Sequence, residues 1–144
     1  MSRTIVLLPC AKSKRSEPCK AMDMYISPLF RGGLRYAQSL KPDKIFILSA
    51  KYGLLHLYDR IIPYERTLNK MGRKERKVWA AGVLAQLIQE CDLENDKFII
   101  LAGEKYREEL LPHLANYIIP IKGLSMGKII KFYKLCTISA KELK

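Results

Sequence analysis

The stretch Thr4-Ile5-Val6-Leu7-Leu8 is a short apolar run rich in β-branched residues, and it predicts a buried β-strand. Runs of the same kind follow at Lys44 to Leu48, Lys97 to Leu101 and Tyr117 to Ile121. Apolar runs without polar alternation are typical of strands that are covered on both faces, as in parallel sheets. We therefore expect a central sheet of about four strands.

Helical patterns lie between and after the apolar runs, at Ser27 to Ser39, Arg73 to Cys91, Glu104 to Ala115 and Met126 to Leu135. Ser125 is the expected N-cap of the last of these helices. Strands that alternate with helices imply parallel pairing through right-handed crossovers. The pattern predicts one α/β domain over residues 1–144, built as a three-layer α/β/α sandwich with a mostly parallel sheet.

The composition is strongly basic: 26 Lys and Arg residues stand against 14 Asp and Glu, which gives a net charge of +12. Such an excess favours a polyanionic partner, and a solvated basic face is the alternative. The apolar runs are far shorter than the roughly 20 residues of a membrane helix, and no signal-peptide pattern is seen. We expect a cytoplasmic protein that binds nucleic acid, DNA rather than RNA, and not a membrane.

The four cysteines stand at scattered spacings, without the Cys-x-x-Cys pairs that are typical of zinc sites. With only two histidines in the chain, a metal site would need ligands from distant segments. We therefore expect free thiols, no metal and no cofactor.

Two predicted connections, Pro9 to Met24 and Ser49 to Gly72, are longer than an α/β unit requires. Both follow the carboxyl ends of predicted strands. Ligands of open parallel sheets bind beyond those ends, so the two loops predict the place of a functional site.

The first loop begins Pro9-Cys10-Ala11-Lys12-Ser13-Lys14-Arg15, and its amides and ammonium groups can hold phosphate. It lacks the glycines and the Gly-Lys-Ser/Thr end of a P-loop, so a nucleoside triphosphate is not indicated. Cys10 is either a nucleophile or, as no histidine base is near it in the sequence, a structural cysteine. We name as substrate contacts the polar and aromatic residues of this loop: Cys10, Lys12, Ser13, Lys14 and Tyr25.

The second loop holds carboxylates, a lysine and tyrosines. Tyr52 and Tyr64 offer flat faces on which an extruded base can stack, and Ser49 starts the loop. Asp59, or in second place Glu65, can stabilise developing positive charge. In the alternative interpretation, Asp59 pairs with Arg60 or caps a turn, Glu65 neutralises Arg66, and the tyrosines only cover the core.

A basic segment continues from this loop into the second predicted helix and suits phosphate contacts, which give affinity without sequence choice. Arg76 belongs to the same segment. The predicted phosphate contacts are Arg60, Arg66, Lys70, Arg73, Lys74 and Lys77. After the third strand, Glu104 either complements the helix dipole or, with Tyr106, contacts substrate.

From about Leu7 to Tyr133 the chain resembles the YaaA-like superfamily. The matching pieces are Leu8-Pro9-Cys10-Ala11-Lys12, Ile47-Leu48-Ser49-Ala50-Lys51-Tyr52-Gly53-Leu54-Leu55, Asp59 through Tyr64, and Ile99-Ile100-Leu101-Ala102-Gly103-Glu104-Lys105-Tyr106. The Pro-Cys piece with its lysine is also similar to the core domain of archaeosine synthase, which is likened to uracil-DNA glycosylases. The resemblance implies a uracil-DNA-glycosylase-like α/β fold and the handling of a nucleobase in nucleic acid.

The chain lacks the helix-hairpin-helix segment of larger YaaA proteins and the water-activating and histidine signatures of true uracil-DNA glycosylases. The first hypothesis is thus a DNA glycosylase-like hydrolase that excises a modified or damaged base, with Asp59, Glu65 and Lys51 as catalytic residues. The alternatives are a non-catalytic DNA-binding stress-response protein and a transferase that modifies a base.

Overall fold

The computed structural model describes residues 2–142, and a five-stranded sheet lies at its centre, in the order β4-β3-β1-β6-β7. Its strands are β1 (Thr4–Pro9), β3 (Lys44–Ser49), β4 (Gly53–His56), β6 (Lys97–Ile100) and β7 (Asn116–Ile118). β1 pairs in parallel with β3 and β6, and β6 with β7, whereas β4 is antiparallel to β3. The α/β class and the mostly parallel sheet are confirmed, with five strands in place of about four.

The additional strand, β4, lies in the segment that the sequence predicts as a loop. The chain turns back on β3 through Ala50 to Tyr52, and Gly53 then adopts a φ of +76°, which side chains rarely tolerate. A Cβ on Gly53 would also clash with Oε1 of Gln86, 2.4 Å away. The same Oε1 accepts a hydrogen bond from the backbone N–H of Leu54 at 2.9 Å, so position 53 requires a glycine. β4 has four residues and begins with a glycine, so any alternation of buried and exposed side chains is too short to be recognised in the sequence.

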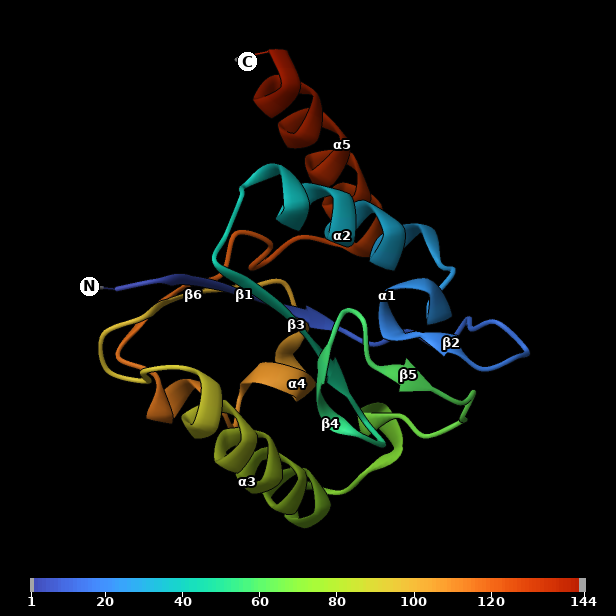
Figure 1. The fold of residues 1–144 in the computed structure, drawn as a ribbon, viewed down its shortest axis with the longest axis vertical. Coiled ribbons are helices and arrows are strands. Elements are labelled where there is room, and N and C mark those ends of the chain that lie inside the picture. Colours follow the sequence, from blue (N-terminus) through green and yellow to red (C-terminus); the bar gives the residue numbers. More distant parts are fainter. Residues whose placement is uncertain (1, 143–144) are drawn as a thin grey trace.

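Helices pack on both faces of the sheet (Figure 1). The helices α2 (Pro28–Ser39) and α5 (Met126–Glu142) lie against each other on one side, and α3 (Arg73–Glu90) and the short α4 (Glu104–Arg107) lie on the other. Their apolar side chains and those of the strands form two separate clusters.

Alternation along β1 assigns its side chains to the two clusters. Val6 and Leu8 pack with Leu34 of α2, whereas Ile5 and Leu7 pack with Val83 of α3. All four β1 side chains are fully buried, so β1 is a strand covered on both faces, as its unbroken apolar run predicts.

The predicted helix boundaries are partly confirmed. Ser27 caps α2, because its Oγ accepts a hydrogen bond from the N–H of Phe30 at 3.2 Å. The helix predicted from Glu104 to Ala115 is wrong beyond its first turns: after α4 the chain forms only the 3-10 helix η2 (Leu111–His113). Pro112 prevents an α-helix from continuing here, because it has no N–H to donate to the carbonyl four residues before it.

The two long loops pair with each other. Strand β2 (Cys19–Lys20) of the first loop is antiparallel to β5 (Arg60–Ile61) of the second. Helix α1 (Ala21–Met24) follows β2, and the N–H of Ala21 donates to the carbonyl of Asp59 at 2.7 Å. The second loop ends with the 3-10 helix η1 (Leu68–Lys70). The two loops thus form one connected layer beyond the carboxyl ends of β1 and β3 (Figure 1).

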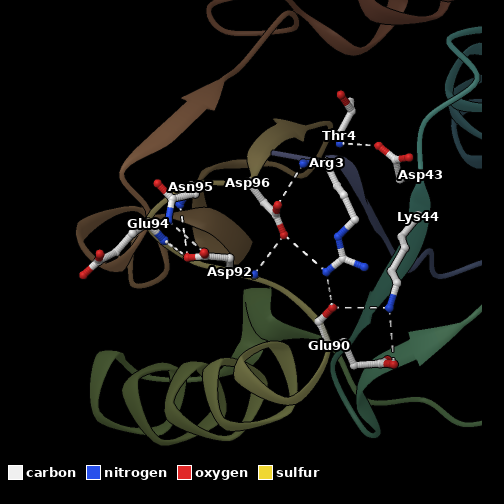
Figure 2. A network of polar contacts seen from close by, with 9 residues as sticks. All are labelled: Arg3, Thr4, Asp43, Lys44, Glu90, Asp92, Glu94, Asn95 and Asp96. Atoms are coloured by element: carbon white, nitrogen blue, oxygen red, sulfur yellow. Dashed lines mark hydrogen bonds and ion pairs between the residues drawn. The ribbon is translucent and has the colours of Figure 1, made fainter. Parts of the chain in front are cut away.

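A polar network ties the opposite, amino end of the sheet together (Figure 2). The backbone N–H of Arg3 donates to Oδ1 of the buried Asp96 at 2.9 Å, and the Arg3 guanidinium donates to the Glu90 carbonyl at 2.7 Å. Lys44 lies 3.7 Å from the Glu90 carboxylate. The starts of β1, β3 and β6 are thereby joined to the end of α3.

Across residues 2–142, no helix combines the length and the apolar character that crossing a membrane would require.

Candidate functional site

The candidate site lies at a topological switch point of the sheet. From β1 the chain passes through α2 to β3 on one side, and it then returns by α3 to β6 on the other side of β1. The carboxyl ends of β1 and β6 are therefore neighbours whose connections leave toward opposite faces. Open α/β sheets bind ligands at this position.

A cysteine and a tyrosine meet across this switch point. Sγ of Cys10, directly after β1, lies 3.2 Å from the hydroxyl oxygen of Tyr106 in α4. Tyr106 is buried, and its hydroxyl also contacts Thr67 and the backbone of Leu68. Burial raises the pKa of Tyr106, and the neighbouring Cys10 thiol raises it further. Tyr106 is therefore a neutral hydroxyl that links β1 and α4 to the second loop.

A chain of buried hydroxyl groups lies beside this pair. Ser49 Oγ donates to the hydroxyl of Tyr64 at 2.8 Å, and the hydroxyl groups of Tyr64 and Tyr25 are 2.5 Å apart. Ser49 Oγ in turn accepts from the N–H groups of Lys51 at 3.2 Å and Tyr52 at 3.0 Å. This chain fixes the turn after β3 to both long loops.

The pKa values of the tyrosines in this hydroxyl chain are raised. Burial raises the pKa of Tyr25 and of Tyr64, and Cys10 adds to both increases. Cys10 has the same effect on Tyr106. The buried tyrosine hydroxyls of both loops and α4 therefore stay neutral.

Lys14 covers the hydroxyl chain from the solvent side. Its Nζ lies 4.5 Å from the ring centroid of Tyr64 and 6.0 Å from that of Tyr25, in cation–π geometry. The side chain is half-buried, and burial lowers the pKa of Lys14, although the nearby Cys10 and Glu65 act in the opposite direction. Lys14 is therefore a partly desolvated amine at the mouth of the site.

Tyr52 adds a second aromatic face. Its ring meets that of Tyr64 edge-on at 5.7 Å, and Nζ of Lys51 lies 5.2 Å from its centroid. Tyr52 is half-buried, whereas Lys51 is exposed. This pair is accessible to a ligand from solvent.

The predicted substrate contacts divide into buried and accessible residues. Tyr25, Ser49, Tyr64 and Tyr106 are buried, so they hold the loops together, and the expectation that Tyr64 offers an open face to a base is wrong. Cys10, Lys14 and Tyr52 are half-buried. The exposed members of the predicted site are Lys12, Ser13, Lys51, Glu65 and Glu104.

Asp59 has a turn role in this structure. Its Oδ2 accepts a hydrogen bond from the N–H of His56 at 2.8 Å and lies 3.3 Å from Nδ1 of the same histidine. Among the residues with described side chains, no hydrogen bond or ion pair joins Asp59 to Cys10, Lys14 or a tyrosine. The Asp59 carboxylate is thus engaged in the turn with His56, whereas Glu65 is the predicted catalytic carboxylate whose charge acts on Lys14.

The predicted phosphate contacts are all exposed: Arg60, Arg66, Lys70, Arg73, Lys74 and Lys77. Arg73 has a surface ion pair with Glu109 at 3.7 Å. Arg76 of the same segment is buried, because it donates to the Met71 carbonyl at 2.6 Å and to Glu108 at 3.2 Å. Arg76 therefore holds the start of α3 in place and is not available to phosphate.

Sequence reasoning missed Trp79 and Thr67. The indole Nε1 of Trp79 donates to the Ser49 carbonyl at 2.8 Å, and its ring meets Tyr106 edge-on at 5.7 Å. Trp79 is the single tryptophan of the chain, and no sequence pattern places it at the site. Thr67 gave no signal, since it lies in the second loop and its neighbour Tyr106 lies far away in the sequence, in α4.

In the part of the chain described here, no three His, Cys, Asp or Glu side chains gather as metal ligands do. All four cysteines are free thiols. A groove of about 380 Å³, lined by residues such as Lys97, Asn116 and Tyr117, lies at the amino ends of β6 and β7, away from the candidate site.

No curated protein and no solved structure shows significant similarity to the chain. A family model does match residues 5–135, which include the whole candidate site. The chain belongs to the DUF6884 family, a family of unknown function.

Proposed function

We propose that this protein binds DNA and processes a nucleobase at the carboxyl end of its sheet, as a glycosylase-like hydrolase that excises a modified or damaged base. One observation carries the proposal: Lys14, the half-buried Tyr52 and the buried Tyr64 form an aromatic and cationic layer beside the switch point, in which Tyr52 is the ring that a base can reach. Aromatic faces bind extruded bases by stacking, and nearby cations hold the flanking phosphates.

The fold supports this proposal at the level of architecture. Separate apolar clusters on the two sheet faces agree with a three-layer α/β/α sandwich of the uracil-DNA-glycosylase-like kind. The sequence resemblance to YaaA-like proteins and to the archaeosine synthase core domain points in the same direction. The four free thiols support a reducing, cytoplasmic setting.

The exposed cations provide the binding part of the function. Lys12 and Lys51 flank the aromatic layer, and the exposed cations Lys70, Arg73, Lys74 and Lys77 lie at the end of η1 and in the first turns of α3. Phosphate contacts of this kind fix the register of a duplex without reading its sequence. A base could then be selected by the shape of the site.

The reaction is a hydrolysis. The bond between C1′ of the sugar and the base nitrogen breaks, the base leaves with that electron pair and gains a proton, and water supplies hydroxyl to C1′. Positive charge develops on the sugar before water adds, and a carboxylate stabilises it. Between the predicted carboxylates, Glu65 is favoured over Asp59, because it follows Tyr64 and acts on Lys14, whereas Asp59 is held by His56.

The test is a base-release assay. Purified protein is incubated with DNA that carries natural, oxidised, hydroxymethylated or glucosylated bases, and free base and abasic sites are measured by mass spectrometry. We expect release of at least one modified base and none of the natural bases. Absence of release from every substrate would exclude excision.

A non-catalytic DNA-binding protein is the second candidate, and the six exposed basic residues of the predicted phosphate surface favour it. This alternative predicts DNA binding with strong salt dependence but no free base in the same assay.

A further inference from the structure

The positive charge of the chain is concentrated in one part of the fold. Residues 24–42 and 110–137 span α2 and most of α5, and they contain no Asp or Glu. Their basic residues are Arg31, Arg35, Lys41, Lys122, Lys128, Lys131 and Lys134. These two stretches therefore supply more than half of the net charge of +12.

Close packing of α2 and α5 brings the two stretches together. The ring of Tyr36 in α2 stacks on the ring of Tyr133 in α5, and their centroids are 5.4 Å apart. Gly33 permits this approach, because a Cβ at position 33 would lie only 3.3 Å from Cε2 of Tyr133. Both helices lie on the face of the sheet opposite to α3 (Figure 1). The packing thus holds cations of both helices in fixed places on one layer of the protein.

Four of these cations lie on the solvent side of the two helices. Lys128, Lys131 and Lys134 follow one another at three-residue steps, so they form a row about 9 Å long on one side of α5. All three are exposed, and so is Arg35 of α2. Arg31 differs, since it is half-buried and donates to a backbone carbonyl at 2.5 Å. The accessible residues Arg35, Lys128, Lys131 and Lys134 together form the helical basic surface.

On the other face of the sheet, acidic side chains balance basic ones. Arg73 and Arg76 of α3 lie 3.7 Å and 3.2 Å from the carboxylates of Glu109 and Glu108. Among the side chains that the structure describes, no ion pair includes a residue of α2 or α5. Like charges on one surface repel one another, and this repulsion opposes the compact state. The helical basic surface therefore fits a polyanion that supplies the missing negative charge.

The exposed side of α5 favours nucleic acid over an anionic membrane as that polyanion. A helix that binds a membrane surface buries a broad apolar face in the lipid. The apolar side chains Ile129, Phe132 and Tyr133 of α5 pack instead against the core, and Met126 and Leu135 are its exposed large apolar residues. Contacts with phosphates need cations and no apolar anchor.

We propose that the helical basic surface binds the phosphate backbone of a DNA duplex and is a second DNA-binding surface of this protein. The predicted phosphate contacts of the candidate site lie in the second loop and α3, whereas the helical basic surface lies on the other face of the sheet (Figure 1). A protein with both surfaces holds two duplexes at once and bridges them. This bridging, unlike the surface itself, rests on the proposed function.

The number of duplexes that one protein molecule binds tests the proposal. The protein is mixed with an excess of a fluorescent duplex of about 10 base pairs, one helical turn, and the complexes are measured by analytical ultracentrifugation at about 50 mM salt. So short a duplex is stiff and does not bend around the sheet to reach both surfaces. We expect complexes of one protein with two duplexes.

Two double substitutions, each removing two positive charges, assign the duplexes to their surfaces. Lys128→Gln/Lys131→Gln changes the helical basic surface, and Lys70→Gln/Lys74→Gln changes the predicted phosphate contacts of the candidate site. Each should leave one bound duplex and lower the affinity for the other by more than about tenfold. Gln is a good helix former, so α5 should remain folded, which the thermal unfolding midpoint checks. Arg35→Gln repeats the test without changing α5, and it should lower the salt slope of binding to this surface by about 0.9.

The matched control is Lys41→Gln/Lys97→Gln, which removes the same charge from exposed positions before β3 and at the start of β6. It should bind two duplexes, as the unchanged protein does. If the control loses the second duplex to the same extent as Lys128→Gln/Lys131→Gln, or if the latter still binds two, the proposal is wrong. Binding of vesicles of phosphatidylserine and phosphatidylcholine without binding of a second duplex would also overturn it, and would assign this face to a membrane.

The same variants separate this inference from the proposed function. If the unchanged protein binds one duplex and only Lys128→Gln/Lys131→Gln loses it, the helical basic surface is confirmed and DNA binding at the candidate site fails. If only Lys70→Gln/Lys74→Gln loses it, the helical basic surface is not a DNA site. Base release from a single short duplex should be the same in Lys128→Gln/Lys131→Gln as in the unchanged protein, because this surface lies away from the site.

Discussion

Cys10 Sγ lies 3.2 Å from the hydroxyl oxygen of Tyr106, and this contact joins the carboxyl end of β1 to α4 across the switch point. The same hydroxyl contacts Thr67 and the backbone of Leu68. Three chain segments that are far apart in the sequence therefore meet at one buried oxygen atom. This oxygen is a structural centre of the site, whatever substrate the site takes.

Tyr106→Phe removes that oxygen and keeps the ring. We expect the free energy of unfolding to fall by about 1 to 2 kcal/mol, because buried partners lose a hydrogen bond and do not regain water. Urea unfolding measures the change. Tyr117→Phe is the control, since Tyr117 is 41% exposed, and it should stay within about 0.5 kcal/mol of the unchanged protein. Equal effects of the two substitutions would show that the Tyr106 hydroxyl does not stabilise the site.

The sequence predicted the site only in part, and the reason is physical. Buried apolar runs such as Thr4 to Leu8 determine strands locally, and they placed Cys10 and the two loops at the correct end of the sheet. The pairing of β2 with β5 and the contacts of Tyr64 and Trp79 depend on which loops meet. Such contacts leave no local period in a sequence, so they appeared only in the structure.

The carboxylates show the same limit. Asp59 and Glu65 are equivalent as residue types six positions apart in one loop, and the sequence favoured Asp59. The turn that closes on His56 uses the Asp59 carboxylate as its acceptor. This hydrogen bond favours Glu65 over Asp59 as the catalytic carboxylate.

Glu65→Gln should abolish base release, because it removes the carboxylate charge that interacts with Lys14. Asp59→Asn should retain release, as its amide oxygen still accepts from the N–H of His56. Both are compared by single-turnover release on the best substrate of the panel. Neither substitution removes a predicted phosphate contact, so duplex affinity should not weaken. Loss of release in Asp59→Asn alone would return the catalytic role to Asp59.

Asp96 predicts acid sensitivity of the amino end of the sheet. Burial acts to raise the pKa of Asp96, but hydrogen bonds from the N–H groups of Asp92 and Arg3, together with the Arg3 guanidinium, outweigh it and lower this pKa below 3.8. A lowered pKa means that the folded protein stabilises the ionised form of the Asp96 side chain more than the unfolded chain does. The stabilisation is therefore complete above pH 3.8 and is lost as the pH falls through the lower, folded-state pKa.

Asp96→Asn is the matching substitution. It should lower the free energy of unfolding at neutral pH. It should also make that free energy fall less steeply in acid than it does in the unchanged protein. Urea unfolding between pH 2.5 and pH 7, on the order of the range where carboxylates titrate, measures both effects. Asp43→Asn, at an exposed carboxylate that accepts from the N–H of Thr4, is the control. A variant whose acid decline remains as steep as that of the unchanged protein would assign the acid sensitivity to other carboxylates.

The exposed lysines at the start of α3 make a quantitative prediction for DNA binding. Each phosphate contact adds about 0.9 to the slope of log affinity against log salt concentration. If Lys70 and Lys74 both contact phosphate, the double substitution Lys70→Gln/Lys74→Gln should lower the slope by about 2, and affinity should fall uniformly across sequences.

The control for this slope is the pair Lys41→Gln/Lys97→Gln, which removes the same charge from exposed positions before β3 and at the start of β6. Its slope should equal that of the unchanged protein, because the amino end of the sheet faces away from the loops. Fluorescence anisotropy of a labelled duplex between about 50 and 200 mM salt gives all three slopes. If both double variants lowered the slope equally, DNA would be held by net charge and not by the surface at the start of α3.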